Sequence, residues 1–218
     1  MFFESIKGYS LSTKELQKRY KCLNPEITLP YFENGQNIII ALSHYGNWEW
    51  GTQVASSAYK HDVATFYKPM PNKYIDAYMQ KLRNQRNMEL LSIYEVHRVQ
   101  RNLDQKPKAY FMVADQSPSN SEKAVWLKFL NQETACFRGI ENYSRLFNMP
   151  VFYLDVQRVK RGYYTVKMDS ICKSPKKTLK DEITILYMNK LESVITQRPE
   201  YWLWSHRRWK IEKASSSK

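Results

Sequence analysis

Cysteine is scarce in this sequence, and its few residues form neither a metal-binding nor a disulfide pattern. Cys22, Cys136 and Cys172 are odd in number, lie far apart and include no CxxC pair. A small disulfide-stapled domain and a zinc ribbon both need several cysteines at short spacings. The sequence therefore excludes both classes and predicts a protein of a reducing compartment, the cytosol.

Long hydrophobic runs are also absent. The longest purely aliphatic run is Ile38 to Leu42, whereas a membrane-spanning helix needs ~20 apolar residues. A signal peptide is not visible either, because Met1-Phe2-Phe3 leads at once into Glu4 and Lys7. We therefore expect no segment that crosses a bilayer.

Acidic side chains are outnumbered by basic ones. The chain has 21 Asp and Glu against 34 Lys and Arg, so its formal net charge is +13. This charge favours an anionic partner, and composition leaves three open: nucleic acid, a phospholipid surface or an acidic carrier protein. Aromatic residues make up 14% of the chain, which excludes an intrinsically disordered protein.

The order of the apolar patterns predicts the fold class. A length of 218 residues fits one domain, which we place at 1–212, followed by a serine- and lysine-rich tail at 213–218. Short apolar runs alternate with amphipathic segments, which predicts an α/β layered sandwich with a central, mostly parallel mixed sheet flanked by helices. The expected strands are 37–43, 63–67 and 108–114, with a hairpin at 151–158 and 163–171, and the expected helices are 11–22, 47–59, 72–88, 137–147 and 178–197.

The segment Ser43-His44-Tyr45-Gly46-Asn47-Trp48-Glu49 follows the first buried strand directly. In sheets of this kind, ligands gather beyond the carboxyl ends of the strands. On one continuous helix His44 and Glu49 would lie about 140° apart, so they can meet only if the chain turns between them, which Gly46 permits. Asn47 is a good N-cap for the helix that follows.

Such a turn would place a histidine in front of a carboxylate. Glu49 could then fix the tautomer of His44 and stabilise its charged form, which is the arrangement of a general base and its orienting group. No GxSxG nucleophile elbow is present, so the base would activate an acceptor hydroxyl. The alternative is an ordinary loop histidine and a solvated glutamate.

Several motifs together resemble one enzyme family. Residues 44–49 are similar to the HX4E box of the glycerolipid acyltransferase superfamily, and more narrowly to the HxGNWE form of the lipid A late acyltransferases, the lauroyl and myristoyl transferases. Further family-like blocks, which extend the likeness from about residue 10 to 210, lie at 66–72, 83–86, 115–116, 129–139 and 199–210. The chain is therefore similar to this branch over most of its length.

The resemblance implies a fold and a reaction. It implies a glycerolipid-acyltransferase-like fold and an acyltransferase that moves a fatty acyl chain from an acyl-thioester donor to a hydroxyl of a membrane lipid. The donor would be acyl carrier protein or acyl-CoA, and the acceptor a lipid A precursor, a lysophospholipid or an aminolipid. His44 would be the general base and Glu49 its partner, with no metal or cofactor. The protein would lie peripherally on the cytoplasmic face of the inner membrane.

The same resemblance implies a set of substrate-binding residues. Arg83 and Arg86 could clamp a phosphate or stabilise an oxyanion; the alternative is an exposed helix face. Asp115 could hold that arginine or the acceptor, or simply begin a turn. The full set is Asn47, Lys68, Arg83, Arg86, Asp115, Gln116 and Gly139.

The chain departs from the family pattern in three places. Lys68 stands where arginine is usual and lacks the planar fork that grips phosphate in a bidentate way. The segment 129–131 lacks the glycine of the family's Phe-x-Gly element. An N-terminal hydrophobic anchor is usual in the family, and we expect that this chain lacks one.

The closing segment His206-Arg207-Arg208 is interleaved with Trp202, Trp204 and Trp209. Such a segment suits a membrane interface, where indoles lie at headgroup level and cations meet phosphates. The alternative is core packing, which we expect for one or two of the three indoles.

Two other hypotheses stay open. A basic, aromatic-rich nucleic-acid-binding protein fits the composition, although no RNP, KH, zinc-finger or helix-turn-helix signature is present. A catalytically inactive, membrane-associated relative is the other, and the presence of both His44 and Glu49 argues against it.

Overall fold

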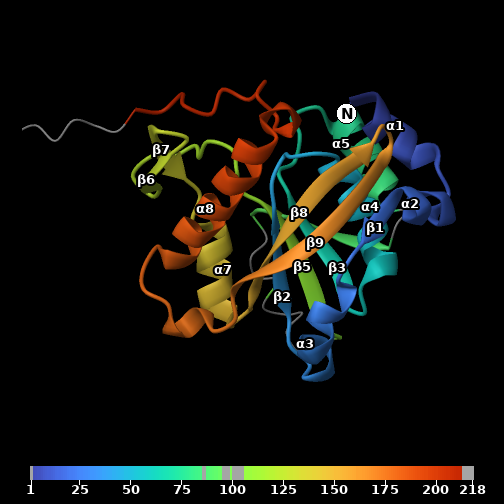
Figure 1. Cartoon of the computed structure of the whole chain (residues 1–218), viewed down its shortest axis with the longest axis horizontal. Coiled ribbons are helices and arrows are strands. Elements are labelled where there is room, and N and C mark those ends of the chain that lie inside the picture. Colours follow the sequence, from blue (N-terminus) through green and yellow to red (C-terminus); the bar gives the residue numbers. More distant parts are fainter. Residues whose placement is uncertain (1, 85–86, 95–98, 100–105, 213–218) are drawn as a thin grey trace, which may run out of the picture.

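The structure is a computed structural model that describes residues 2–84, 87–94, 99 and 106–212. Its centre is a seven-stranded sheet in the order β1-β9-β8-β2-β5-β3-β4, beside a separate hairpin of β6 and β7 (Figure 1). The strands are β1 (Tyr20–Cys22), β2 (Ile38–Leu42), β3 (Asp62–Tyr67), β4 (Met88–Ser92), β5 (Lys108–Val113), β6 (Val125–Phe129), β7 (Gln132–Cys136), β8 (Val151–Lys160) and β9 (Tyr163–Cys172).

The five strands from β8 to β4 are mutually parallel. The long strand β9 runs antiparallel to β8, and β1 is parallel to β9 at the sheet edge. The expected α/β sandwich with a mostly parallel mixed sheet is therefore confirmed. Because β2 and β5 are neighbours in parallel register, their carboxyl ends lie side by side, with Leu42 opposite Val113.

Helices cover both faces of the sheet. They are α1 (Phe2–Ser10), α2 (Thr13–Arg19), α3 (Leu29–Glu33), α4 (Trp48–Ala58), α5 (Lys73–Asn84), α7 (Gly139–Phe147) and α8 (Glu182–Gln197), with short 3-10 turns at Pro25–Thr28, Pro175–Lys177 and Pro199–Tyr201. Figure 1 shows α7 and α8 together on one side of the sheet and α1, α2 and α4 on the other. Within the described residues, no helix combines the length and the apolar character needed to cross a membrane.

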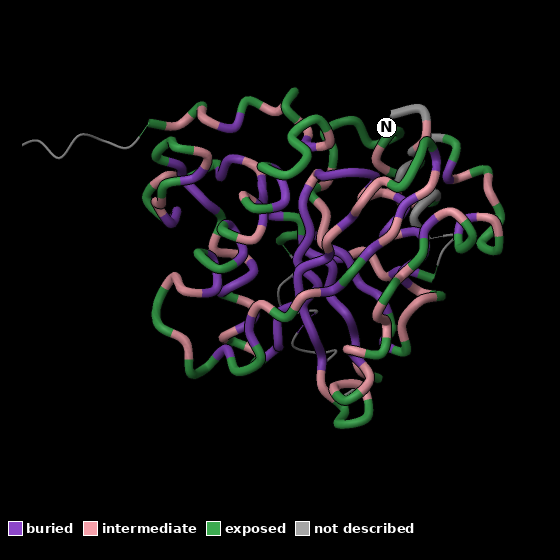
Figure 2. The backbone as a smooth tube through the Cα atoms, viewed as in Figure 1, coloured by how far each residue is buried: buried purple, intermediate pink, exposed green. Residues whose placement is uncertain are grey.

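Strand β2 divides the core into two layers. All five of its residues are buried, as the purple tube at the centre of Figure 2 shows. Ile39 and Ala41 belong to the layer under α7 and α8, whereas Ile38, Ile40 and Leu42 belong to the layer under α2 and α4. A strand buried on both faces must be apolar at every position, which explains the uninterrupted run that the sequence shows here.

Two helices predicted from the sequence end early, and each gives way to a strand. The helix expected at 11–22 begins after its predicted N-cap, since Ser12 Oγ accepts the Glu15 N–H at 3.2 Å, but it stops at Arg19. Its last three residues form β1, where Tyr20 and the rest of the strand pair with β9. The helix expected at 72–88 ends at Asn84, and β4 begins at Met88. Pairing with a distant strand outweighs helix propensity in both places.

The β6–β7 hairpin was not predicted. Its turn is Leu130-Asn131, and both residues have positive φ, 47° and 63°. A two-residue turn of this kind normally carries Asn or Gly at both positions. With Leu130 at the first position, the usual sequence pattern of a hairpin turn is missing. Helices α1 and α3 and strands β1 and β4 also went unpredicted. The tail at 213–218 lies outside the described residues.

Candidate active site

The turn predicted after β2 forms at Gly46. Its φ is +56°, and a Cβ at this position would lie 2.9 Å from Val156 Cγ1, so the position suits glycine alone. Asn47 then caps α4, because its side-chain oxygen accepts the Trp50 N–H at 3.2 Å. The turn and the N-cap are both confirmed, and together they hold His44 beyond the carboxyl end of β2.

The carboxylate bonded to the His44 ring belongs to Asp115. The two side chains are joined through Nδ1 and Oδ1 at 2.7 Å, and Oδ2 accepts the backbone N–H of His44 at 3.1 Å. Asp115 follows β5, the neighbour of β2 in the sheet. The sequence assigned the orienting role to Glu49 and a substrate contact to Asp115; at Nδ1, the structure places Asp115 in the orienting position.

Burial and hydrogen bonding oppose each other at Asp115. Burial by itself raises the pKa of this carboxyl, since only 2% of the residue is exposed. The hydrogen bond and positive charge of His44, followed by the Trp202 indole at 2.9 Å, outweigh it and bring the pKa of Asp115 below its ordinary value. In the uncharged form of His44, the ionised Asp115 favours the tautomer with its proton on Nδ1, which leaves Nε2 as the basic nitrogen.

Glu49 lies in the first turn of α4 and lines the same cavity as His44. Its Oε1 accepts the phenolic O–H of Tyr9, on α1, at 2.5 Å. Trp48 lies between the two motif residues in the sequence. Its indole stands edge-on to the His44 imidazole, with ring centroids 5.0 Å apart. The two ends of the HX4E box therefore line one cavity, with His44 in the loop after β2 and Glu49 in α4.

Two cavities of about 420 and 400 Å³ adjoin at His44, each large enough for a small-molecule ligand. Their walls share six residues: His44, Phe66, Tyr67, Lys68, Val113 and Gln116. The first cavity has a polar wall that includes Glu49, Thr52, Asp76 and Gln80. The second is mostly apolar, and its further lining includes Ile93, Met112, Ala114, Phe137, Ile140 and Tyr143.

The C-terminal motif is joined to the HX4E box by backbone hydrogen bonds. Leu203 N–H donates to His44 O at 3.0 Å, and Gly46 N–H donates to Tyr201 O at 3.0 Å. Tyr45 and Trp202 form an isolated antiparallel bridge. Two sequence blocks, at 44–49 and 199–210, therefore come together around the histidine.

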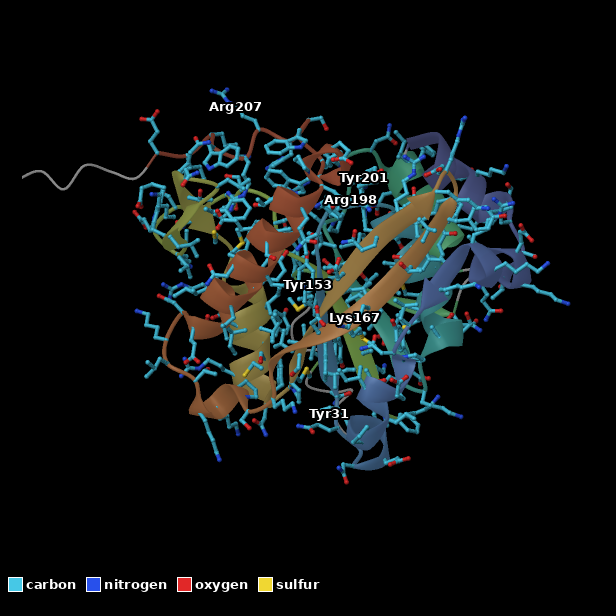
Figure 3. The ribbon with its side chains drawn as sticks, in the orientation of Figure 1. Tyr31, Tyr153, Lys167, Arg198, Tyr201 and Arg207 are labelled. Carbon is cyan, nitrogen blue, oxygen red and sulfur yellow. The ribbon has the colours of Figure 1, made fainter. Side chains whose placement is uncertain are left out.

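The three indoles of this motif have separate positions. Trp202 is buried and Trp209 packs against the same core cluster, so the expected core packing of one or two indoles is confirmed. Trp204 is 51% exposed, and Arg207 points away from the protein body (Figure 3). Trp202 is the site residue that sequence reasoning missed, as a hydrogen-bond partner of the Asp115 carboxylate.

His206 and Arg208 each form a hydrogen bond close to the site. Burial, followed by the charges of Lys210 and Arg208, lowers the pKa of His206, so its neutral Nε2 can accept the Ser117 N–H at 3.1 Å. Arg208 is buried and donates from Nη2 to Cys136 Sγ at 3.4 Å. Burial nevertheless raises the pKa of Cys136 to about 11, which keeps it a thiol at neutral pH.

The other predicted substrate residues have different outcomes. Lys68 and Gln116 line both cavities, and Gly139 lines the second. Asn47 is buried, with 1% exposed, and serves as the helix cap, so it acts on the site through the position of α4. The side chain of Arg83, and Arg86 as a whole, lie outside the described residues. Among the described residues, no group of three His, Cys, Asp or Glu side chains is arranged to hold a metal ion.

A family match covers almost the whole chain. The model of the bacterial lipid A biosynthesis acyltransferase family matches residues 1–211. The chain belongs to this family. The resemblance to the lipid A late acyltransferases is therefore confirmed, and this lipid A biosynthesis acyltransferase family member is an acyltransferase enzyme. Comparison with curated proteins finds no match.

Proposed function

We propose that this acyltransferase moves a fatty acyl chain from an acyl-thioester donor to a hydroxyl of a membrane lipid, with His44 as the general base. The observation that carries the proposal is the 2.7 Å contact between His44 Nδ1 and Asp115 Oδ1, at the junction of two cavities. The chemistry needs an oriented base with room for two substrates on either side of it.

The proposed reaction begins when Nε2 of His44 takes the proton of the acceptor hydroxyl. The alkoxide oxygen attacks the thioester carbonyl and forms a tetrahedral oxyanion, which collapses with loss of the donor thiolate. The imidazolium then returns its proton to that thiolate, so the enzyme ends in its starting state. Asp115 holds the ring and stabilises its charged form throughout. Lys68, on the wall of both cavities, is placed to stabilise the oxyanion, a role that Arg83 can share.

Glu49 has a supporting role in this proposal. It lines the first cavity together with His44, and a nearby negative charge favours the imidazolium form of a histidine. The Tyr9 hydroxyl holds its carboxylate. Glu49 therefore assists the charge change on His44 from the wall of the same cavity, while Asp115 sets the orientation of the ring.

The two cavities suggest different substrates. The apolar second cavity suits the acyl chain, because burial of its methylenes is favourable there. The first cavity, with Glu49, Gln80 and Lys68 on its walls, suits the polar acceptor. The acceptor is a lipid A precursor or a lysophospholipid in this proposal, and the net charge of +13 favours an acidic acyl carrier protein as the donor.

The place of action proposed for the enzyme is the cytoplasmic face of the inner membrane, in peripheral contact with anionic lipid. The family membership supports the acyltransferase hypothesis over a nucleic-acid-binding protein. The basic charge that suggested nucleic acid serves a lipid surface or a carrier protein equally well.

The deciding experiment incubates the protein with labelled acyl carrier protein and acyl-CoA donors and a panel of lipid acceptors, read by mass spectrometry. His44→Ala should retain its circular dichroism spectrum and lose transfer to every acceptor. His61→Ala removes an imidazole that lines neither cavity and should keep transfer as long as it folds. Transfer by a folded His44→Ala protein at the parent rate would refute the mechanism.

A further inference from the structure

Three large side chains near the start of helix α5 point outward. Tyr74, Ile75 and Tyr78 are 89%, 51% and 61% exposed. Surface helices of globular proteins normally show the reverse, with the apolar stripe against the core.

The polar side chains of α5 face the protein instead. Asp76 and Gln80 line the first cavity, and Gln80 Nε2 donates to Asp76 Oδ2 at 2.7 Å and to the Tyr67 hydroxyl at 2.9 Å. Asp76 Oδ1 also accepts the Met70 N–H at 2.9 Å. Residues four apart share a helix face, so Asp76 and Gln80 occupy one face, and Tyr74 and Tyr78 lie roughly opposite to them.

Helix α5 borders the active site through Asp76 and Gln80. Helix α5 follows β3, whose carboxyl end carries Lys68, and Figure 1 shows α5 on the same edge of the molecule as the C-terminal segment. Exposed Met70 precedes the helix and lines the first cavity. Exposed Ile93 and Phe137 line the second. Exposed apolar side chains therefore occur both on the outer face of α5 and on the walls of the two cavities that hold His44.

The chemistry of this face fits a lipid headgroup layer. Tyrosine has an apolar ring and a polar hydroxyl and is enriched at membrane interfaces. Lys73 and Lys81 lie on the same helix, both exposed, and would meet the phosphates of anionic lipids in a bilayer. A helix with one polar face, one apolar face and basic residues is typical of proteins that lie in the membrane interface.

We infer that the Tyr74, Ile75 and Tyr78 face of α5 docks the enzyme on an anionic bilayer and presents the first cavity to lipid in that bilayer. This inference rests on the proposed function, because it assigns the lipid acceptor its route to His44. The polar inner face of α5 then lies between the bilayer and the reacting groups, and the membrane-facing side of the helix takes no part in the chemistry.

The test uses the variant Tyr74→Ser/Ile75→Ser/Tyr78→Ser. None of the three residues lines either cavity at the active site. The matched control is Leu23→Ser/Leu146→Ser/Leu179→Ser, which changes three apolar residues of similar exposure, 60%, 65% and 78%, outside those cavities. Both proteins are assayed by co-sedimentation with phosphatidylethanolamine–phosphatidylglycerol vesicles and with phosphatidylcholine vesicles.

We expect the parent protein to bind the anionic vesicles more tightly than the neutral ones. The affinity of the α5 variant for these vesicles should fall by at least about tenfold, because each apolar side chain contributes binding free energy when it is buried in the bilayer. The control variant should bind as the parent does. An α5 variant that binds like the parent, a parent that does not bind vesicles, or an equal loss in the control would overturn the inference.

Acyl transfer supplies an independent readout. The α5 variant should lose transfer to an acceptor embedded in vesicles and retain transfer to the same headgroup on a short-chain, monomeric lipid. Equal loss on both acceptors would overturn the docking role, because it would show damage to the site itself. If the parent transfers to neither acceptor, the proposed function fails, and the vesicle measurement alone still decides whether α5 docks on lipid.

Discussion

Trp202 and His44 bind the same carboxylate from two sides. The Trp202 indole donates to Asp115 Oδ2 at 2.9 Å, and His44 Nδ1 lies 2.7 Å from Asp115 Oδ1. The three residues come from the C-terminal segment, the end of β5 and the end of β2. A buried carboxylate needs such partners to stay ionised, so the C-terminal motif contributes to the state of the base without lining either cavity.

Asp115→Asn should abolish most of the activity while the protein stays folded. An amide has no negative charge to stabilise the imidazolium, and it can hold the wrong tautomer of His44. We expect kcat to fall by about 10³-fold with little change in KM. The measurement is steady-state kinetics over a range of pH, with Asp62→Asn, on the surface, as the control. Glu49→Gln should cost less, and a larger loss for Glu49→Gln would assign the orienting role to Glu49.

Trp202→Phe should weaken both the site and the fold. The substitution keeps the aromatic packing against Phe129 and removes one hydrogen bond to a buried charge, which costs about 1.5–3 kcal/mol. The pKa of Asp115 should rise towards its ordinary value. Stability derived from the depressed pKa is present above that ordinary value and disappears as the pH falls through the folded-state pKa, so the difference from the parent should shrink in acid.

Urea unfolding at several pH values measures this effect. Trp204→Phe is the matched control, because its indole is half exposed and bonds the Pro199 carbonyl. A Trp202→Phe protein as stable as the control at neutral pH would contradict the prediction.

Gly46→Ala should destabilise the turn that carries His44. The φ of +56° is unfavourable for alanine, and the new methyl would meet Val156 Cγ1 at 2.9 Å. Backbone strain alone costs about 1–3 kcal/mol, and activity should fall with it, since His44 moves. Gly35→Ala separates the two causes: its φ is +68°, and nothing lies within 4 Å of the added Cβ. Equal losses of unfolding free energy in the two variants would show that the steric contact is unimportant.

His61 should make the protein less stable in mild acid. Burial lowers the pKa of His61, although the Gln36 carbonyl and Asp62 oppose the shift. Below the ordinary value of about 6.5, the unfolded chain binds a proton on His61 that the folded state resists. The free energy of unfolding therefore decreases as the pH is lowered, by at most about 1.4 kcal/mol per pH unit. Thermal unfolding of the parent and of His61→Gln, from neutral pH to about pH 5, checks this. Parallel curves for the two proteins would contradict the prediction.

Local signals predicted much of the fold correctly. The run Ile38 to Leu42, the cap at Ser12 and the turn at Gly46 depend on side-chain type and spacing within a few residues, and all three are confirmed. Strands β1 and β4 were missed because they form by pairing with β9 and β3, and the local sequence does not indicate those pairings. The β6–β7 turn was missed because leucine rarely adopts the positive φ found at Leu130.

Within the site, too, the partner of His44 depends on tertiary structure and not on the local sequence. The spacing of His44 and Glu49 directs attention to a carboxylate close in sequence, whereas the one on Nδ1 lies 71 residues further along. Asp115 was recognised as the end of a strand, but the sheet order that places β5 beside β2 was needed to make it the partner. The outward turn of α5 was equally hidden, because an amphipathic pattern does not say which face meets the core.

The sequence alone determined the alternation of strands and helices, the turn after the first buried strand and the family to which the chain belongs, since each depends on residue types at fixed local spacings. Tertiary structure decided which carboxylate orients the imidazole, where Trp202 donates and which side of α5 faces water. Those features depend on strand order and on the packing of segments far apart in the chain, and hydrogen bonds between such segments exist only once the whole sheet has formed.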